Sequence, residues 1–123
     1  MGFYEYQEDG SRQLWQELTT HFPTTKQDYS REELIERLLF TQVIEAIWCL
    51  QEGVIQSIPE ANLGSIYGWG FPAFKGGAVQ YINDYGLAAF IEKCELYEEQ
   101  LGRRFKVPSL LKKKRKEGTL VVQ

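Results

Sequence analysis

The chain has 123 residues, of which 43% are hydrophobic and 25% charged, as in an ordinary soluble domain built around one core. Its formal charge of -3 argues against nucleic-acid binding, and its apolar runs are shorter than the ~20 residues that span a membrane. Residues 1–10 are aromatic and acidic, unlike a secretory signal, so we expect a protein inside the cell with no nucleic-acid partner and no membrane span.

Residues 1–28 are polar and irregular, which is typical of a lead-in segment with at most a short helix over 11–20. The only histidine, His21, lies here, so a histidine general base would have to act from this segment, and we expect none to do so. No segment alternates apolar and polar residues for long enough to predict a strand.

A long helix is predicted to begin at Ser30, because Ser30 and Glu33 form a capping box. Gly53 stands where such a helix would end. Between them the apolar residues recur at spacings of three and four, which indicates a central, largely buried helix. These residues are Leu34, Ile35, Leu38, Leu39, Val43, Ile44, Ala46, Ile47 and Leu50.

A second capping box, Ser57 with Glu60, predicts a shorter helix that Gly68 ends. The following loop, 68–77, is rich in glycine and aromatic residues, and we expect its rings to cover an apolar surface. The expected fold class is all-α, with about five helices around one long central helix. The remaining helices are expected over residues 78–85, 87–101, where Gly102 ends the pattern, and 109–116.

The loop formally contains the relaxed dinucleotide-binding fingerprint, Gly68-x-Gly70-x-x-Ala73. That fingerprint needs a strand before it and a helix directly after it, whereas here a helix precedes and Pro72 interrupts. We therefore interpret the glycines as structural.

Few other residues have a catalytic or metal-binding interpretation. Cys49 and Cys94 each lie inside an apolar helical pattern, which favours buried, reduced thiols over a metal or redox pair. The serines have no positioned base beside them. We predict no catalytic, cofactor-binding or metal-ligating residue in this chain.

Two charged features have alternative interpretations. Glu45 lies among apolar residues, so it sits either at the boundary of the helix or partly buried with a partner such as Arg37, and a structural hydrogen bond is favoured over catalysis. The basic run 112–116 is favoured as a solvated helix end. A CoA phosphate or an acidic neighbouring domain stays open as its partner.

Several of these motifs together resemble a known family, the C-terminal domain of 3-hydroxyacyl-CoA dehydrogenases, over roughly residues 29–111. The similarity is to the second copy of that domain in the multifunctional fatty-acid oxidation enzymes. Its most specific part is the Gly-Phe-Pro-x-x-x-Gly-Gly pattern in the loop. The residues that carry it are Arg37-Leu38-Leu39, Glu45-Ala46, Cys49 to Gly53, Glu60 to Gly64, Gly68 to Pro72 with Gly76-Gly77, Tyr81-x-x-x-Tyr85-Gly86, and Phe105-x-x-Pro108-x-Leu110-Leu111.

The resemblance implies a helical fold of the 6-phosphogluconate dehydrogenase C-terminal type, spanning residues 29–117 and followed by a tail over 118–123. Because residues 2–6 resemble the tail of the first copy, residues 1–28 would be a linker and lead-in from a preceding domain. The implied partners are the first copy and the nucleotide-binding domain of the same polypeptide, with an acyl-CoA as the substrate of the whole enzyme. NAD would be bound outside this chain, and the isolated chain is expected to be inactive and to form homo-oligomers. The expected location is the bacterial cytoplasm, with a mitochondrial one left open.

One departure from the family bears on function. In the family an Asn just before the Arg-Leu-Leu pattern of the first copy helps to hold the substrate, and Glu36 stands at that position here. A carboxylate would repel the developing oxyanion, so the substrate-holding role is not carried over. Phe71 and Phe74 are open to two interpretations, as lining of an acyl path or as cover for the core.

Two alternative functions are kept. One is a free-standing helical module whose basic end binds CoA or another phosphate compound, and the other is the helical domain of a different hydroxyacid dehydrogenase.

Overall fold

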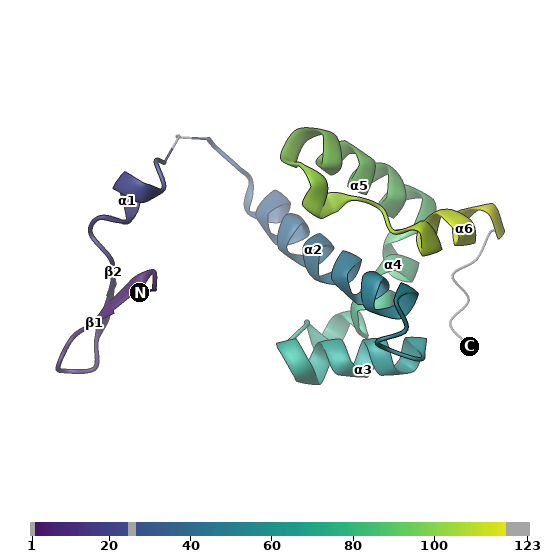
Figure 1. Cartoon of the computed structure of the whole chain (residues 1–123), viewed down its shortest axis with the longest axis horizontal. Helices are drawn as coiled ribbons and strands as arrows, with labels where there is room; N and C mark the ends of the chain where they lie inside the picture. The colour runs from purple at the N-terminus through teal and green to yellow at the C-terminus, as the bar shows by residue number, and fades with distance from the viewer. Residues whose placement is uncertain (1, 25–26, 118–123) are drawn as a thin grey trace.

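The computed structural model describes residues 2–24 and 27–117, and this part is mostly helical (Figure 1). A bundle of five helices, α2 to α6, follows a small N-terminal hairpin and a one-turn helix. The predicted all-α class is confirmed. The elements are β1 (Tyr4–Tyr6), β2 (Arg12–Leu14), α1 (Leu18–His21), α2 (Arg31–Gln51), α3 (Ile58–Trp69), the 3-10 turn η1 (Ala73–Lys75), α4 (Ala78–Tyr85), α5 (Leu87–Leu101), the 3-10 turn η2 (Arg103–Phe105) and α6 (Ser109–Glu117).

The long helix α2 begins and ends where the sequence predicts. The backbone N–H of Glu33 donates to Ser30 Oγ at 3.1 Å, which is the expected cap. After the helix, Gly53 adopts a φ of 74°, a left-handed conformation that glycine takes without steric penalty.

Helix α3 has the predicted start and a later end. Glu60 N–H donates to Ser57 Oγ at 3.4 Å, which is the expected cap. The Glu60 carboxylate reaches back to the N–H of Gln56, the residue before the cap, at 3.1 Å. The prediction that Gly68 ends the helix is wrong by two residues. The left-handed cap is Gly70, with a φ of 74°, while Gly68 lies within the last turn.

The start of α4 is capped by side chains from α3. The residue before α4 is Gly77, which has no side chain to offer. Instead Asn62 Oδ1 accepts from the N–H groups of Val79 and Gln80 at 2.9 and 3.0 Å, and Ser65 Oγ accepts from Ala78 N–H at 3.0 Å. These bonds satisfy three of the backbone donors that a helix start leaves unpaired. They also place α4 against α3 at a fixed distance.

The close approach explains the glycine at this turn. A Cβ on Gly77 would lie 2.5 Å from the Cα of Asn62, and the φ of Gly77 is 110°. Both the lack of room for a side chain and the backbone conformation of Gly77 therefore exclude other residues at this position. The loop glycines are structural, as predicted, since they serve the α3–α4 contact.

The last helices match their predicted ranges to within one residue at each end. Helix α6 also has a distant cap, because Gln51 Oε1 at the end of α2 accepts from Leu110 N–H at 2.9 Å and from Ser109 Oγ at 2.8 Å. The end of the central helix therefore fixes the start of the last one.

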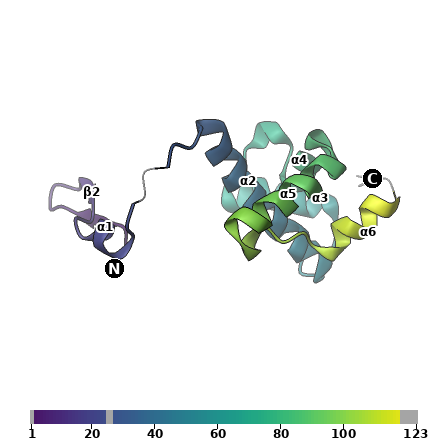
Figure 2. The same ribbon diagram turned by 90° about the horizontal axis from the view of Figure 1, so that it is seen from above.

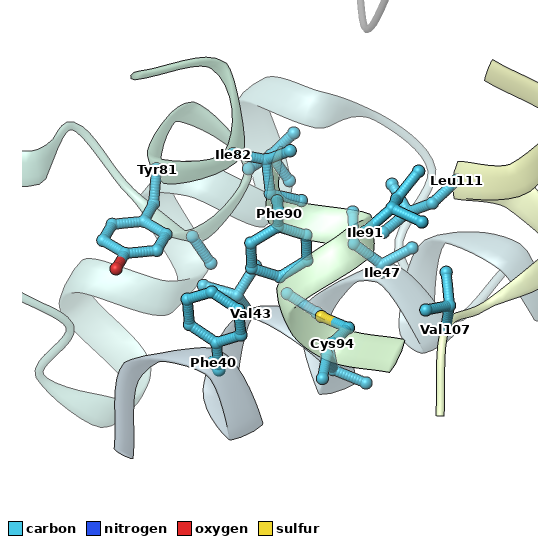
Figure 3. Close-up of a cluster of buried hydrophobic side chains, with 14 of the residues drawn as sticks. Phe40, Val43, Ile47, Tyr81, Ile82, Phe90, Ile91, Cys94, Val107 and Leu111 are labelled. Carbon is cyan, nitrogen blue, oxygen red and sulfur yellow. The ribbon is translucent and has the colours of Figure 1, made fainter. Parts of the chain in front are cut away.

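One hydrophobic core joins α2, α4, α5, η2 and α6 (Figure 3). Phe40 of α2 lies at its centre, with ring centroids 4.4 Å from Phe90, 5.3 Å from Tyr85 and 5.7 Å from Tyr97. Aromatic contacts of this kind add to the free energy of simple burial. Cys94 is buried in this core, whereas Cys49 is only half-buried, so the prediction of two buried thiols is correct for Cys94 and partly wrong for Cys49.

The N-terminal segment contains an antiparallel hairpin, so the prediction of no strand is wrong, and the short helix expected over 11–20 is present only as the one-turn α1 near its end. β1 pairs with β2, with Tyr4 opposite Leu14 and Tyr6 opposite Arg12. The turn is built on Asp9-Gly10: Ser11 N–H donates to Asp9 Oδ1 at 2.9 Å, and Gly10 has a φ of 81°. Asp-Gly between paired strands is a recognised hairpin signal, and three-residue strands are too short to show alternation.

The hairpin and α1 lie apart from the helical bundle in both views (Figures 1 and 2). Within the described ranges, no helix is long and apolar enough to cross a membrane.

Candidate functional site

Glu36 is the centre of a polar cluster that joins three helices. It projects from the N-terminal half of α2. Tyr97 of α5 donates to Glu36 Oε1 at 2.5 Å, and Tyr85, the last residue of α4, donates to Glu36 Oε2 at 3.0 Å. Lys93 Nζ lies 3.4 Å from Oε1. Each carboxylate oxygen is therefore engaged by a donor from its own chain.

The two tyrosines are held in their neutral form. Burial, then the hydrogen bond to Glu36 and its charge, raises the pKa of Tyr85 to about 12. The same causes in the same order raise the pKa of Tyr97 above its usual range. A neutral hydroxyl can donate to the carboxylate, so the pKa shifts and the hydrogen bonds describe one interaction.

The chemistry open to this cluster is limited. Its outer side is a cavity of about 290 Å³, lined by Glu32, Glu33, Glu36, Lys93 and Tyr97. Three carboxylates face this space against one ammonium group, so a developing oxyanion would be repelled. The arrangement suits the fixing of α2, α4 and α5 to one another.

Arg37 and Glu45 do not form the contact that the sequence left open. Arg37 pairs with Glu33 at 2.6 Å and stacks on the ring of Tyr29 at 4.4 Å. Glu45 is exposed on the surface of α2, so the expectation of a helix boundary or a buried partner is wrong for it. The helix carries Glu45 outward between buried neighbours, because successive residues point about 100° apart.

The loop aromatics behave differently from one another. Phe71 is buried in the core with 2% of its surface exposed, whereas Phe74 is 87% exposed, so the expected cover for the core holds for Phe71 alone. Trp69 is also partly exposed. It lines a groove of about 370 Å³ between α2 and α3 together with Thr41, Gln42 and Glu45, and we call these four residues the α2–α3 groove.

The α2–α3 groove holds an unsatisfied polar atom. Within the described part of the chain, Gln42 Oε1 is buried and has no hydrogen-bond donor. Such atoms are uncommon, because a buried acceptor without a donor destabilises a folded chain.

The remaining candidates lie apart from Glu36. His21 is on α1, where its ring stacks on Trp15 at 5.1 Å. On α6, Lys112, Lys113 and Lys116 are exposed, and Arg115 lies 3.3 Å from Glu92. The described residues bring together no group of three or more metal-binding side chains. The expected absence of cofactor and metal sites stays a prediction.

Sequence reasoning missed the partners of Glu36. Tyr85 and Tyr97 are 49 and 61 residues away along the chain, so no local pattern joins them to α2. One signal was available, since Lys93 and Tyr97 are four residues apart and share a helix face.

The described chain is thus an all-α helical domain whose internal carboxylate is satisfied by its own tyrosines and lysine. No protein-family model matches it. Over 93 residues, 76% of its length, it is 42% identical to fatty acid oxidation complex subunit alpha of Colwellia psychrerythraea strain 34H. The chain spans only 13% of that protein. It is therefore homologous to a short segment of a fatty acid oxidation subunit.

Proposed function

We propose that this chain is a non-catalytic helical domain of a multifunctional β-oxidation enzyme with 3-hydroxyacyl-CoA dehydrogenase activity. In that enzyme the nucleotide-binding domain would hold NAD and carry the proton acceptor for oxidation of the acyl-CoA substrate. The chain would act in the bacterial cytoplasm as a packing partner of those domains. The similarity to subunit alpha supports this proposal over a helical domain of another hydroxyacid dehydrogenase.

The observation that carries the proposal is the state of Glu36. At the position where the resembling family holds its substrate with an amide, this chain has a carboxylate whose oxygens accept from Tyr85 and Tyr97. An amide can donate to an oxyanion, whereas a carboxylate cannot. The cluster therefore fits a domain that has kept its packing and lost contact with the substrate.

The surface for that packing is the α2–α3 groove with the exposed Phe74. The surface of the groove is mostly apolar, and the ring of Trp69 forms part of it. A neighbouring domain that covers the groove would remove apolar area from water. The first copy of the domain and the nucleotide-binding domain are the proposed neighbours.

A segment exchange tests this function. The segment of the Colwellia subunit alpha that matches the chain is replaced by the chain, and NADH formation from a 3-hydroxyacyl-CoA is measured. We expect the chimera to keep the dehydrogenase activity and the isolated chain to have none. NADH formation by the isolated chain would contradict the proposal.

The packing surface is tested in the same chimera. Trp69→Asp places a charge in the groove and should lower the midpoint of thermal inactivation. Tyr67→Asp is the matched control, because Tyr67 lies on the same helix and is 85% exposed. Equal effects of the two substitutions would show that the groove is not covered.

A second candidate is phosphate binding at α6, favoured by a cavity of about 460 Å³ beside Lys112, Arg115 and Lys116. Calorimetry with CoA tests it. Binding that weakens with salt and disappears when Lys112 and Lys116 become Ala would favour this function. The same salt-sensitive binding in the variant would exclude α6 as the site.

A further inference from the structure

The N-terminal hairpin has two different faces. Residues that pair directly across strands share a face, so Tyr4, Tyr6, Leu14 and Arg12 lie on one side. Phe3 lies on the other side, where its ring is 5.9 Å from that of Phe22 in an edge-on contact. We call Tyr4, Tyr6 and Leu14 the aromatic face.

The aromatic face is uncovered. Its three side chains are 45% to 73% exposed, and Arg12 lies over the Tyr4 ring at 5.2 Å. An isolated two-stranded hairpin with three-residue strands is marginally stable in water. The hairpin therefore needs a second apolar surface to be ordered.

A matching surface lies at the start of α2. Leu34, Ile35 and Leu38 are 44% to 65% exposed although they belong to the apolar pattern of the central helix. They share one side of the helix, because residues three and four apart are neighbours there. We call these three residues the α2 stripe.

One pair of opposite charges flanks the two surfaces, although the exposed Arg31 lies beside Glu32 at the start of α2. Arg12 is the charged residue on the side of the aromatic face. Glu32 is exposed in the first turn of α2, three residues before Ile35, and so lies at the edge of the α2 stripe. Docking of the aromatic face on the stripe can bring this pair of opposite charges together.

We propose that the hairpin of one chain docks on the α2 stripe of a second copy, and that two chains exchange hairpins in a symmetric dimer. The segment 23–30 joins the hairpin to α2 and can span up to about 27 Å, more than the width of a helix. In the structure the hairpin stands away from its own bundle, as an exchanged arm does (Figure 2). This surface is separate from the α2–α3 groove of the proposed function.

Sedimentation velocity on the full chain is the first test. We expect a dimer whose dissociation constant rises at least about tenfold on Leu14→Asp or on Leu38→Asp, because each places a charge in an apolar contact. Leu63→Asp, on an exposed part of α3, should leave the dimer unchanged. Circular dichroism confirms that the variants are folded, which is expected since all three sites are exposed.

Mixing distinguishes exchange from other dimers. The Leu14→Asp chain keeps an unchanged stripe and the Leu38→Asp chain keeps an unchanged hairpin, so the mixture should form a tighter dimer than either variant forms alone. Arg12→Glu and Glu32→Arg should each weaken the dimer, and the two together in one chain should restore it.

A cross-link identifies the pairing directly, in a Cys49→Ala background. Tyr6→Cys on one chain should form a disulfide with Leu38→Cys on another, and Gln13→Cys, on the opposite hairpin face, should not. A monomer at high concentration, a disulfide confined to one chain, or a dimer that ignores Leu14→Asp and Leu38→Asp would overturn the proposal. None of these outcomes bears on the chimera that tests the proposed function.

Discussion

At the scale of single residues, the carboxylate of Glu36 holds three helices together, because it accepts hydrogen bonds from tyrosines of α4 and α5. Its removal by Glu36→Ala would leave the hydroxyls of Tyr85 and Tyr97 without their acceptor. We expect the free energy of unfolding in urea to fall by about 2 kcal/mol, the usual effect of leaving partly buried donors unpaired. Glu45→Ala, on the exposed side of the same helix, should change it by less than about 0.5 kcal/mol. Equal losses for the two variants would contradict the role of Glu36.

Tyr81 makes a separate prediction about pH. Burial, and then the charge of Glu36, raises its pKa to about 12 in the folded chain, above the ordinary value of about 10. The unfolded chain therefore loses this proton first, so the stability from the neutral hydroxyl is complete below pH 10 and disappears as the pH rises to about 12. The free energy of unfolding should fall less steeply above pH 10 in Tyr81→Phe than in the natural chain. If the free energy of unfolding falls equally steeply above pH 10 in both proteins, the raised pKa of Tyr81 is contradicted.

At the scale of elements, the sequence predicted those helices whose signals are local. Ser30 and Ser57 each lie three residues from the N–H that they cap, so the starts of α2 and α3 could be read directly. The caps of α4 and α6 come from Asn62 and Gln51, up to 18 and 59 residues away, and no periodicity reveals them. The tyrosine partners of Glu36 could not be predicted from the sequence for the same reason, because they are 49 and 61 residues away. The fold class could therefore be predicted, but the contacts that build the site could not.

The close contact between α3 and α4 predicts that alanine substitutions at two glycines change the free energy of unfolding in opposite directions. Gly77→Ala would force a Cβ to 2.5 Å from Asn62 at a φ of 110°, so we expect a loss of at least about 2 kcal/mol. Gly64→Ala, inside α3 with open space around it, should raise the free energy of unfolding by about 0.5–1 kcal/mol. Chemical denaturation of both variants checks the sign as well as the size. A tolerated Gly77→Ala would mean that α4 does not approach α3 so closely.

At the scale of the whole molecule, the hairpin and the bundle should differ in stability. The core lies entirely in the bundle, whereas no residue of β1, β2 or α1 is buried. Amide protection follows such differences in burial, since segments with few buried contacts open with little free energy. The molecule is therefore expected to behave as a stable bundle that carries a weakly ordered arm.

Hydrogen exchange at two concentrations tests that expectation. In dilute solution, the amides of β1 and β2 should exchange rapidly while those of α2, α4 and α5 stay protected. At a concentration where the chain dimerises, the hairpin should gain protection, because its aromatic face is then covered. Gly10→Ala, which strains the turn at a φ of 81°, should abolish the gain and leave the bundle unaffected. Equal protection of hairpin and bundle at both concentrations would show that the hairpin is ordered within a single chain. Docking of the aromatic face on a second chain would then not be the cause of its order.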